Sequence, residues 1–308
     1  MASPRSPDSG SPPTPVDMGD FAQIYEACEP FVVARPEVAE ALDTKPLGVP
    51  IPPQNIFNPQ HLSSSSFLSL AKSLDSMTYG PLGLKMPDWV FYDCAVMPGA
   101  IVGFGRRAQE LEPWLRAGMA ISDSYEGLVP VSLFIAIPTP GRERWIGYTL
   151  CSINEVAAGG APEGLWRLTL AMGTASLRID QMRSTTRWRS PGFGIYGSMG
   201  PLELVTAWTP AHDVPETVTF DLETDAAARA RLLDTSSVVR VTPHRMLDAD
   251  NTEEMRALQH EIEAGRRWAI VGPAEIKGAR TRVPLADLDA KILEIGHDDV
   301  DFRQRFQG

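Results

Sequence analysis

The apolar residues of this chain show their clearest period just after Gly164, where they recur at spacings of three and four. Such spacing places them on one face of a helix that begins near residue 165. The residues on that face are Leu165, Leu168, Met172, Ala175, Ile179 and Met182. A turn over 156–164 precedes the helix, because its glycines and proline do not fit together inside regular structure.

Runs rich in β-branched and aromatic residues flank this helix and predict strands. They lie at 89–97, 100–104, 128–138, 145–153, 184–188, 202–209 and 216–222. The turn residues at 139–143 join 128–138 to 145–153 as adjacent antiparallel strands. The sequence therefore predicts an α+β fold with a mixed, largely antiparallel central sheet flanked by helices, and with N- and C-terminal extensions.

Changes in composition divide the chain into four parts. They are a disordered, Pro- and Ser-rich tail at 1–16, a helical and Pro-rich extension at 17–88, the central domain at 89–223 and an α/β accessory region at 224–308. The extension includes a predicted helix over 63–77, and a helix is also expected over 106–116 of the central domain. In the accessory region we predict a capped helix over 251–265, a strand at 268–271 and a helix over 283–295.

Charge and composition limit the classes of function. The 308 residues carry a formal net charge of −11, which argues against a general nucleic-acid or anionic-membrane surface. No apolar run reaches about 18 residues, and no signal-type N-terminus is present, so we expect a cytoplasmic protein. No lysine occurs between Lys85 and Lys277, so the middle of the chain offers neither a Schiff-base lysine nor a Gly-Lys-Ser/Thr phosphate loop.

Cysteine and histidine give little sign of a metal site. The three cysteines are far apart in apolar surroundings, which is typical of reduced core residues. The five histidines have no metal-ligand spacing, so we expect no metal. His212 lies beside Asp213 in a polar turn, where it either acts as a general base or only satisfies the turn.

Arginines gather around the predicted helix, although the chain as a whole is acidic. From 164 to 190 the charged residues are Arg167, Arg178, Arg183, Arg187 and Arg189 against a single Asp180. A glycine-rich turn that leads into a helix also leaves backbone N–H groups at the positive end of the helix dipole. This region is therefore either a binding site for an anionic phosphate group or the solvated face of an ordinary amphipathic helix.

Residues 142–223 resemble the cofactor-binding half of the GNAT superfamily of acyl-CoA-dependent N-acyltransferases. The resemblance lies in the order of strand, turn, helix, strand, broken helix and strand, and in Tyr196, which falls where that family's last helix carries a tyrosine. It implies that acetyl-CoA or another acyl-CoA donates an acyl group to an amine acceptor. It also implies that strands 145–153 and 184–188 separate beside Gly164.

The resemblance assigns roles to individual residues. The strand end at Cys151 to Ile153 would offer a backbone N–H to the thioester carbonyl. The pyrophosphate would be held by Gly160, Gly164 and Arg167. Tyr196 would protonate the departing thiolate; from its position alone it is equally a half-buried tyrosine at a turn. Glu155 lies near the proposed reaction centre and is, with His212, a candidate base.

Two other interpretations stay open at the level of sequence. The family's phosphate loop has Gln or Arg where this chain has Gly159, and a central Gly where it has Pro162, which lacks an N–H. These departures favour a non-catalytic binding or regulatory protein that keeps the fold. The run 96–102 is similar to the Pro-Gly entry of the central helix in hot-dog thioester enzymes, although Gly103 and Gly105 favour a strand there.

Overall fold

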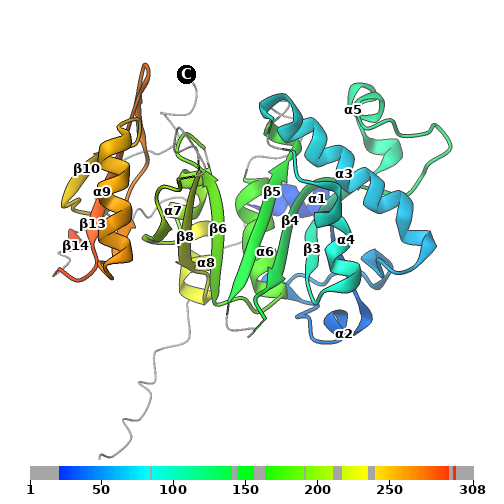
Figure 1. The fold of residues 1–308 in the computed structure, drawn as a ribbon. Coiled ribbons are helices and arrows are strands. Elements are labelled where there is room, and N and C mark those ends of the chain that lie inside the picture. The colour runs from blue at the N-terminus through cyan, green and yellow to red at the C-terminus, as the bar shows by residue number, and fades with distance from the viewer. Residues whose placement is uncertain are drawn as a thin grey trace, which may run out of the picture.

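A computed structural model of the protein describes residues 21–83, 85–140, 144–155, 164–190, 192–210, 217–234, 240–290 and 294–295 (Figure 1). Most described strands form one twelve-stranded sheet in the order β10-β13-β11-β7-β8-β6-β5-β4-β3-β1-β2, with β12 paired to β13. Neighbouring strands run antiparallel except in the pairs β1–β2 and β5–β6. The predicted fold class, a mixed and largely antiparallel sheet flanked by helices, is confirmed.

The strands and helices have the following bounds. The first half of the sheet contains β1 (Glu29–Ala34), β2 (Ile56–Phe57), β3 (Ala100–Arg107), β4 (Leu128–Pro138) and β5 (Trp145–Ser152). The second half contains β6 (Gln181–Arg187), β7 (Leu202–Thr206), β8 (Thr217–Glu223), β10 (Arg245–Asp248), β11 (Trp268–Ile270), β12 (Glu275–Lys277) and β13 (Arg280–Asp287), while β9 (Arg240–Val241) pairs separately with β14 (Glu294–Ile295). The α-helices are α1 (Ala22–Ala27), α2 (Pro36–Ala39), α3 (Ser65–Tyr79), α4 (Asp88–Val96), α5 (Pro113–Gly118), α6 (Leu165–Ser176), α7 (Gly192–Gly197), α8 (Ala226–Leu233) and α9 (Thr252–Glu263).

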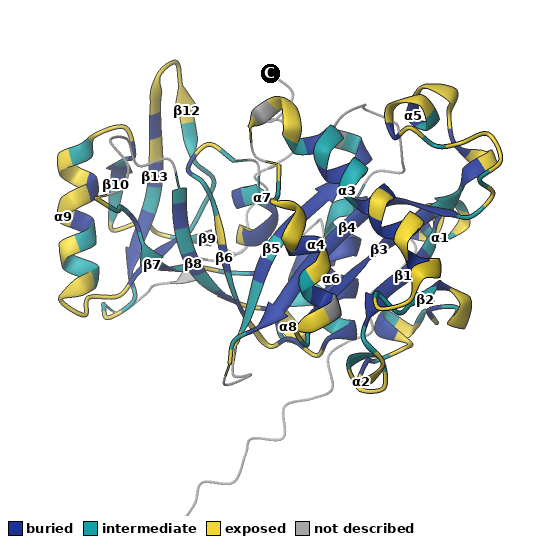
Figure 2. Ribbon diagram, turned by 45° about the vertical axis from the view of Figure 1, so that its right-hand side comes forward, coloured by how far each residue is buried: buried dark blue, intermediate teal, exposed yellow. Residues whose placement is uncertain are grey.

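Helices cover both faces of the first half of the sheet (Figures 1 and 2). Ser132 of β4 is 2.6 Å from Thr169 of α6, oxygen to oxygen, so alternate β4 side chains face α6. On the opposite face, α3 and α4 pack against β4. The strand β4 is buried over its whole length because it lies between these two layers.

The predicted strand at 89–97 is wrong, because this segment is the helix α4. Its aromatic and β-branched content favours a strand, but its buried residues Val90, Phe91 and Cys94 lie on one helical face. Pro87 fills the N-cap position and Asp88 the first turn, where a negative charge is favourable. Helical spacing therefore outweighs residue preference here.

The predicted helix over 283–295 is also wrong. Thr281, Val283 and Leu285 are buried in alternation with more exposed residues, which is the period of a strand, and the segment pairs with β10, β11 and β12 as β13. The helix expected over 106–116 is confined to α5, since β3 continues to Arg107 and Pro113 begins the helix instead of shortening it.

The other predicted elements are confirmed in outline. The helix at 63–77 is α3, and the strand preferred at 100–104 is β3. The helix α9 begins after Asn251, whose side chain accepts hydrogen bonds from the N–H groups of Glu253 and Glu254. The helix after Gly164 ends at Ser176, so Met182 belongs to β6.

The segments outside 89–223 join the same sheet. The strand β1 pairs with β3, and α3 packs against β4 and β5, so the N-terminal extension contributes to the central layers. At the other end, β11 pairs with β7 and carries the sheet into the C-terminal region. In the described parts of the chain, none of the helices has the length and apolar character needed to cross a bilayer.

Candidate active site

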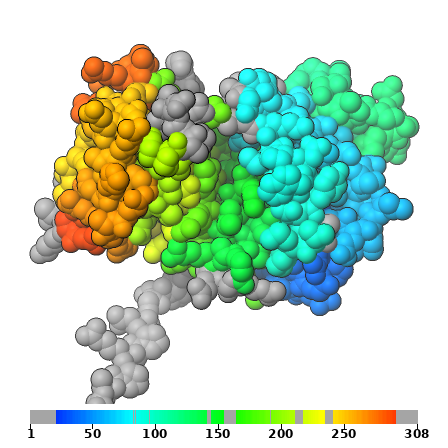
Figure 3. All heavy atoms as spheres, viewed as in Figure 1, coloured from blue at the N-terminus to red at the C-terminus, as the bar shows by residue number. Residues whose placement is uncertain are grey.

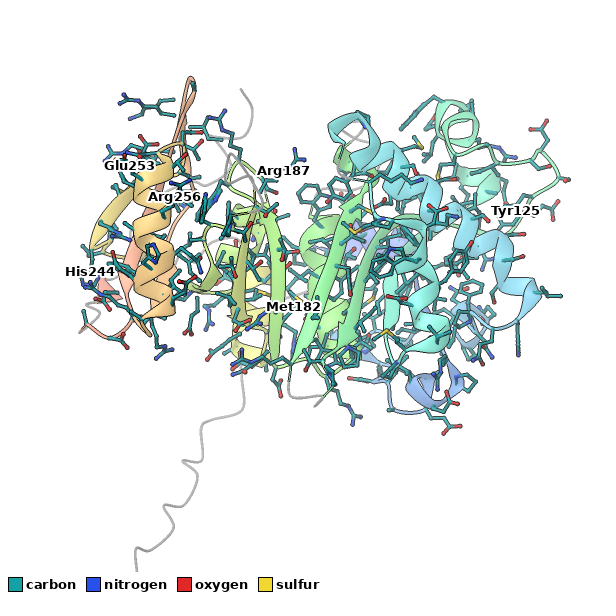
Figure 4. The ribbon with its side chains drawn as sticks, in the orientation of Figure 1. Tyr125, Met182, Arg187, His244, Glu253 and Arg256 are labelled. Atoms are coloured by element: carbon teal, nitrogen blue, oxygen red, sulfur yellow. The ribbon has the colours of Figure 1, made fainter. Side chains whose placement is uncertain are left out.

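The strands β5 and β6 separate soon after they meet. They pair in parallel at only three positions, Trp145 with Met182, Ile146 with Arg183 and Gly147 with Ser184. Beyond these pairs β5 continues to Ser152 and β6 to Arg187, with no pairing between them. Figure 1 shows the two strands diverging, and Figure 4 places Met182 at the closed end and Arg187 at the open end. We call this opening the β5–β6 gap.

An ion-pair network holds the closed end of the gap. Arg183 of β6 donates two hydrogen bonds to the carboxylate of Asp221 on β8, at 2.8 and 2.9 Å. Arg144, which immediately precedes β5, donates to the same carboxylate at 2.5 Å. The hydrogen bond from Arg183 to Asp221 raises the pKa of this guanidinium. One carboxylate thus connects β6, β8 and the start of β5.

A β-bulge changes the direction of side chains on β5. Ile135 of β4 pairs with Thr149 and Ala136 with Gly147, so Tyr148 is the extra residue of the bulge. As a result, two consecutive side chains contact the layer of α3 and α4. The ring of Tyr148 meets that of Trp89 on α4, and the Thr149 hydroxyl lies 3.5 Å from the carboxylate of Asp75 on α3.

The edge of β5 that faces the gap carries a tyrosine hydroxyl. Ser132 of β4 donates to the carbonyl of Cys151 at 3.1 Å, so that carbonyl points toward β4. Successive carbonyls of a strand point to opposite edges, which directs the Leu150 carbonyl toward the gap. The hydroxyl of Tyr79, the last residue of α3, donates to this carbonyl. The sequence analysis missed Tyr79; its position at the end of the predicted helix was the available signal.

Asp75 is a fully buried carboxylate beside this edge. It accepts a hydrogen bond from the Met86 N–H at 2.8 Å, and the Thr149 hydroxyl is its other recorded neighbour. Burial raises the pKa of Asp75. The Met86 hydrogen bond and the charge of Lys85 lower this pKa by less, so the net shift is upward. The structure therefore maintains a carboxyl group that gains a proton more readily than an exposed aspartate.

We expect Asp75→Asn to remove a pH dependence of stability. The pKa of Asp75 is higher in the folded state than in the unfolded state, so its contribution favours folding at low pH and is lost as pH rises through the folded-state pKa. The free energy of unfolding of the variant minus that of the wild type should therefore increase from acid to neutral pH. Urea unfolding at a series of pH values measures this difference, and a constant difference would contradict the prediction.

The structure describes several of the residues that the resemblance selected. Cys151 and Ile153 are buried at the end of β5 and in the short 3-10 helix Ile153–Glu155. Gly164 precedes α6 with a φ of 82°, a left-handed conformation that favours glycine. Tyr196 is buried in α7, with its ring 5.5 Å from that of Phe220 on β8. Their predicted roles toward a cofactor stay predictions.

Three predicted site residues are not described in atomic detail. Gly160 and His212 lie outside the described residues, as do Gly159 and Pro162. Glu155 is placed in the backbone of the 3-10 helix that follows β5, but its side chain is not described. Their predicted roles stay predictions.

The arginine cluster is dispersed by the fold. Arg167 donates to the Ser198 hydroxyl at 3.1 Å and to the Leu232 carbonyl at 3.0 Å, which ties α6 to α7 and α8. Arg183 pairs with Asp221, and Arg189 pairs with Asp250 at 3.1 Å. Arg187 ends β6 at the open side of the gap (Figure 4). Figure 3 shows the green atoms of β5 and β6 set back there between the cyan atoms of α3 and α4 and the orange atoms of α9.

The strand order and the β5–β6 gap define an acyl-CoA N-acyltransferase-like fold, as the sequence resemblance predicted. The residues that would form the hot-dog central helix are instead the interior strand β3. Neither a family model nor a curated protein sequence matches the chain.

Three solved structures are similar to part of the chain. The NatC complex bound to Gag peptide and CoA is 12% identical, with 54% of this chain and 96% of that chain covered and a TM-score of 0.36. A proposed acyl-CoA N-acyltransferase from Klebsiella pneumoniae is 11% identical, with 55% and 100% covered and a TM-score of 0.29. A proposed acetyltransferase is 15% identical, with 53% and 87% covered and a TM-score of 0.27. Because all three TM-scores are below 0.5, we base the fold on strand order and strand separation.

Proposed function

We propose that the protein is an N-acyltransferase that moves an acyl group from acyl-CoA to an amine by direct attack. The observation that carries this proposal is the β5–β6 gap, which opens after three parallel pairs, so that β6 does not cover the edge of β5 beyond Gly147. The backbone groups of such an edge can form hydrogen bonds with the amides of an extended ligand, which then lies beside β5 as a neighbouring strand would. The pantetheine arm of coenzyme A has this extended, amide-bearing form.

Two described segments are suited to bind the pyrophosphate end and the thioester end of such a ligand. At the start of α6, Gly164 leads into a twelve-residue helix whose first N–H groups lie at the positive end of the helix dipole, a favourable position for a pyrophosphate. At the end of β5, backbone groups from Leu150 to Ile153 would orient the thioester. In the reaction the acceptor nitrogen forms a bond to the thioester carbon, the carbon–sulfur bond breaks, the acceptor loses a proton and the thiolate gains one.

For the proton that the thiolate gains, we propose Tyr196 as donor, with Tyr79 as the second tyrosine near the gap. For the proton that the acceptor loses, Glu155 and His212 stay the proposed bases. Comparing Tyr196→Phe with Tyr79→Phe tests the donor, because only loss of the donor should lower turnover without weakening CoA binding.

Binding of CoA and of acetyl-CoA to the purified chain tests the proposal. A ligand that binds only the folded state raises the unfolding temperature in a concentration-dependent manner. We expect such a shift with both compounds, and release of free thiol from acetyl-CoA when an amine is added. Absence of any shift at about millimolar ligand would overturn the proposal, whereas a shift without thiol release would favour a non-catalytic binding protein.

We expect Gly164→Ala to weaken CoA binding severalfold and to lower stability. An L-residue at a φ of 82° costs about 1–2 kcal/mol, and the added Cβ would lie 3.0 Å from the ring of Phe21. Isothermal titration with CoA and urea unfolding measure the two effects. Gly265→Ala is the matched control, since Gly265 has a φ of 90° with nothing within 4 Å of the added Cβ. The control should lose stability but keep its affinity for CoA.

A further inference from the structure

The helix α4 presents an aromatic face to solvent. Trp89 is 54% exposed, Tyr92 is 47% exposed and Val96 is 71% exposed, although each is a large apolar side chain. Their spacings of three and four place them on one side of the helix, and the opposite side is buried against the sheet. Figure 2 shows α4 beside β5 on the surface of the sheet. Exposed aromatic residues that gather on one helix face are typical of a binding surface.

This face adjoins the point where the β5–β6 gap opens. The rings of Trp89 and Tyr148 lie edge to face, with centroids 6.1 Å apart and an angle of 87°. Tyr148 is the bulge residue of β5 and follows Gly147, the last residue of β5 that pairs with β6. The aromatic face of α4 is therefore continuous with the entrance to the gap.

Asp93 places a negative charge at this entrance. It lies one helical turn after Trp89 and is half-buried, so its side chain is on the same side of α4. Its charge acts on the hydroxyl of Tyr148, whose pKa is raised first by burial and then by Asp93. Burial also raises the pKa of Asp93 itself. Asp93, Trp89 and Tyr148 thus form a partly desolvated acidic and aromatic cluster.

The nearby lysines neutralise a different carboxylate. Lys72 and Lys85 pair with Asp88, at 2.7 and 3.3 Å. Lys72 also lies over the ring of Tyr92, 5.3 Å from its centroid, which shows that this aromatic face accepts a cation. Among the residues that the structure describes, no ion pair or hydrogen bond is recorded for the Asp93 carboxylate. The described residues therefore leave the negative charge of the cluster without a neutralising partner, and this charge would attract a cationic ligand.

We propose that Asp93, Trp89 and Tyr148 bind an ammonium group of the acyl acceptor, and that the acceptor is a small aliphatic diamine. The proposal rests on the proposed N-acyltransferase function. A carboxylate next to two aromatic faces binds an alkylammonium group by an ion pair and cation–π contact. The bound ammonium is not the reacting nitrogen, because the open edge of β5 from Leu150 to Ser152 lies two to four residues beyond Tyr148. At ~3.3 Å per residue this separation is about 7–13 Å, which a second amino group at the far end of the same molecule can span.

The site is tested by comparing α,ω-diamines of increasing length with monoamines of the same length, in both binding and turnover. We expect the diamines to be acylated with a kcat/KM at least about tenfold above that of the matched monoamine, as one ion pair of this kind provides. Diamines should also quench tryptophan fluorescence in the absence of CoA, and added salt should reverse the quenching.

Two variants and their controls assign the effect to the cluster. Asp93→Asn should remove the preference for diamines, and Trp89→Leu should reduce it and abolish the quenching. The controls are Asp88→Asn, which removes another carboxylate of α4, and Trp114→Phe, which changes another tryptophan that is 42% exposed. Both controls should keep the preference for diamines over monoamines. The CoA-induced thermal shift should be the same in all four variants, which separates this site from the CoA site.

Equal use of monoamines and diamines by the wild type would overturn the proposal, and this comparison needs no variant. An unchanged preference in a folded Asp93→Asn would overturn it as well. If CoA fails to bind while diamines still quench fluorescence in a manner that depends on Asp93, the cation site is supported and the acyltransferase function is not.

Discussion

Gly103→Ala is expected to lower the free energy of unfolding by about 3 kcal/mol, because two closely packed backbones cannot easily move to admit the added methyl group. Gly103 lies in β3, between β1 and β4. A Cβ there would be 2.1 Å from the Ser132 carbonyl oxygen and 2.9 Å from the Leu133 Cα, both backbone atoms of β4. It would also be 2.8 Å from the ring of Phe31. The strands β3 and β4 would have to move apart to admit one methyl group, although β4 is buried over its whole length.

Urea unfolding followed by circular dichroism measures this loss. Gly80→Ala is the matched control, because Gly80 has ordinary helical dihedral angles and nothing lies within 4 Å of its added Cβ. We expect the control to stay within about 0.5 kcal/mol of the wild type. If the urea concentration at the unfolding midpoint is the same for Gly103→Ala and Gly80→Ala, β3 and β4 are not packed as described.

Asp221→Ala is expected to weaken CoA binding about tenfold and to cost about 1–2 kcal/mol of stability, as for loss of a partly exposed ion-pair network. Asp221 holds Arg183 of β6 and Arg144 next to β5, at the only three residue pairs that join these strands. Without the carboxylate two guanidinium groups repel one another across this junction. The two strands should then separate further, and the gap should fit its ligand less well.

Thr219→Ala provides the control for this variant. Thr219 lies on the same strand and the same face, where its hydroxyl contacts that of Thr185 at 2.9 Å. It links β8 to β6 without reaching β5, so CoA affinity should be unchanged. Isothermal titration of both variants decides the matter: equal affinities would show that the Asp221 network does not shape the gap.

The central fold was predictable from the sequence because its signals are local. The apolar period after Gly164, the turn at 139–143 and the Asn251 cap each act within a few residues, and the structure contains α6, the β4–β5 hairpin and α9 at these places. Residues 89–97 and 283–295 were misassigned because content and period conflicted there, and tertiary packing followed the period.

The candidate site was less predictable, because it depends on contacts between distant segments. Tyr79 and Asp75 belong to α3, which no local motif connects with the strand β5 that they contact. The bulge at Tyr148 depends on the register between β5 and β4, and no local sequence pattern predicts it. No local motif indicates that Arg167 donates to Ser198 and to Leu232, which belong to later segments of the chain; its role toward a phosphate stays a prediction.

The β5–β6 junction also divides the chain in sequence. In the twelve-stranded sheet, every strand before α6 lies on one side of this junction and every strand after α6 lies on the other. Each half is thus a continuous stretch of chain whose other strand pairs are made within that half. Opening of the gap therefore leaves the strand pairs inside each half intact. A ligand in the gap would add a further connection between two halves whose strands are joined by three residue pairs and by the Asp221 carboxylate.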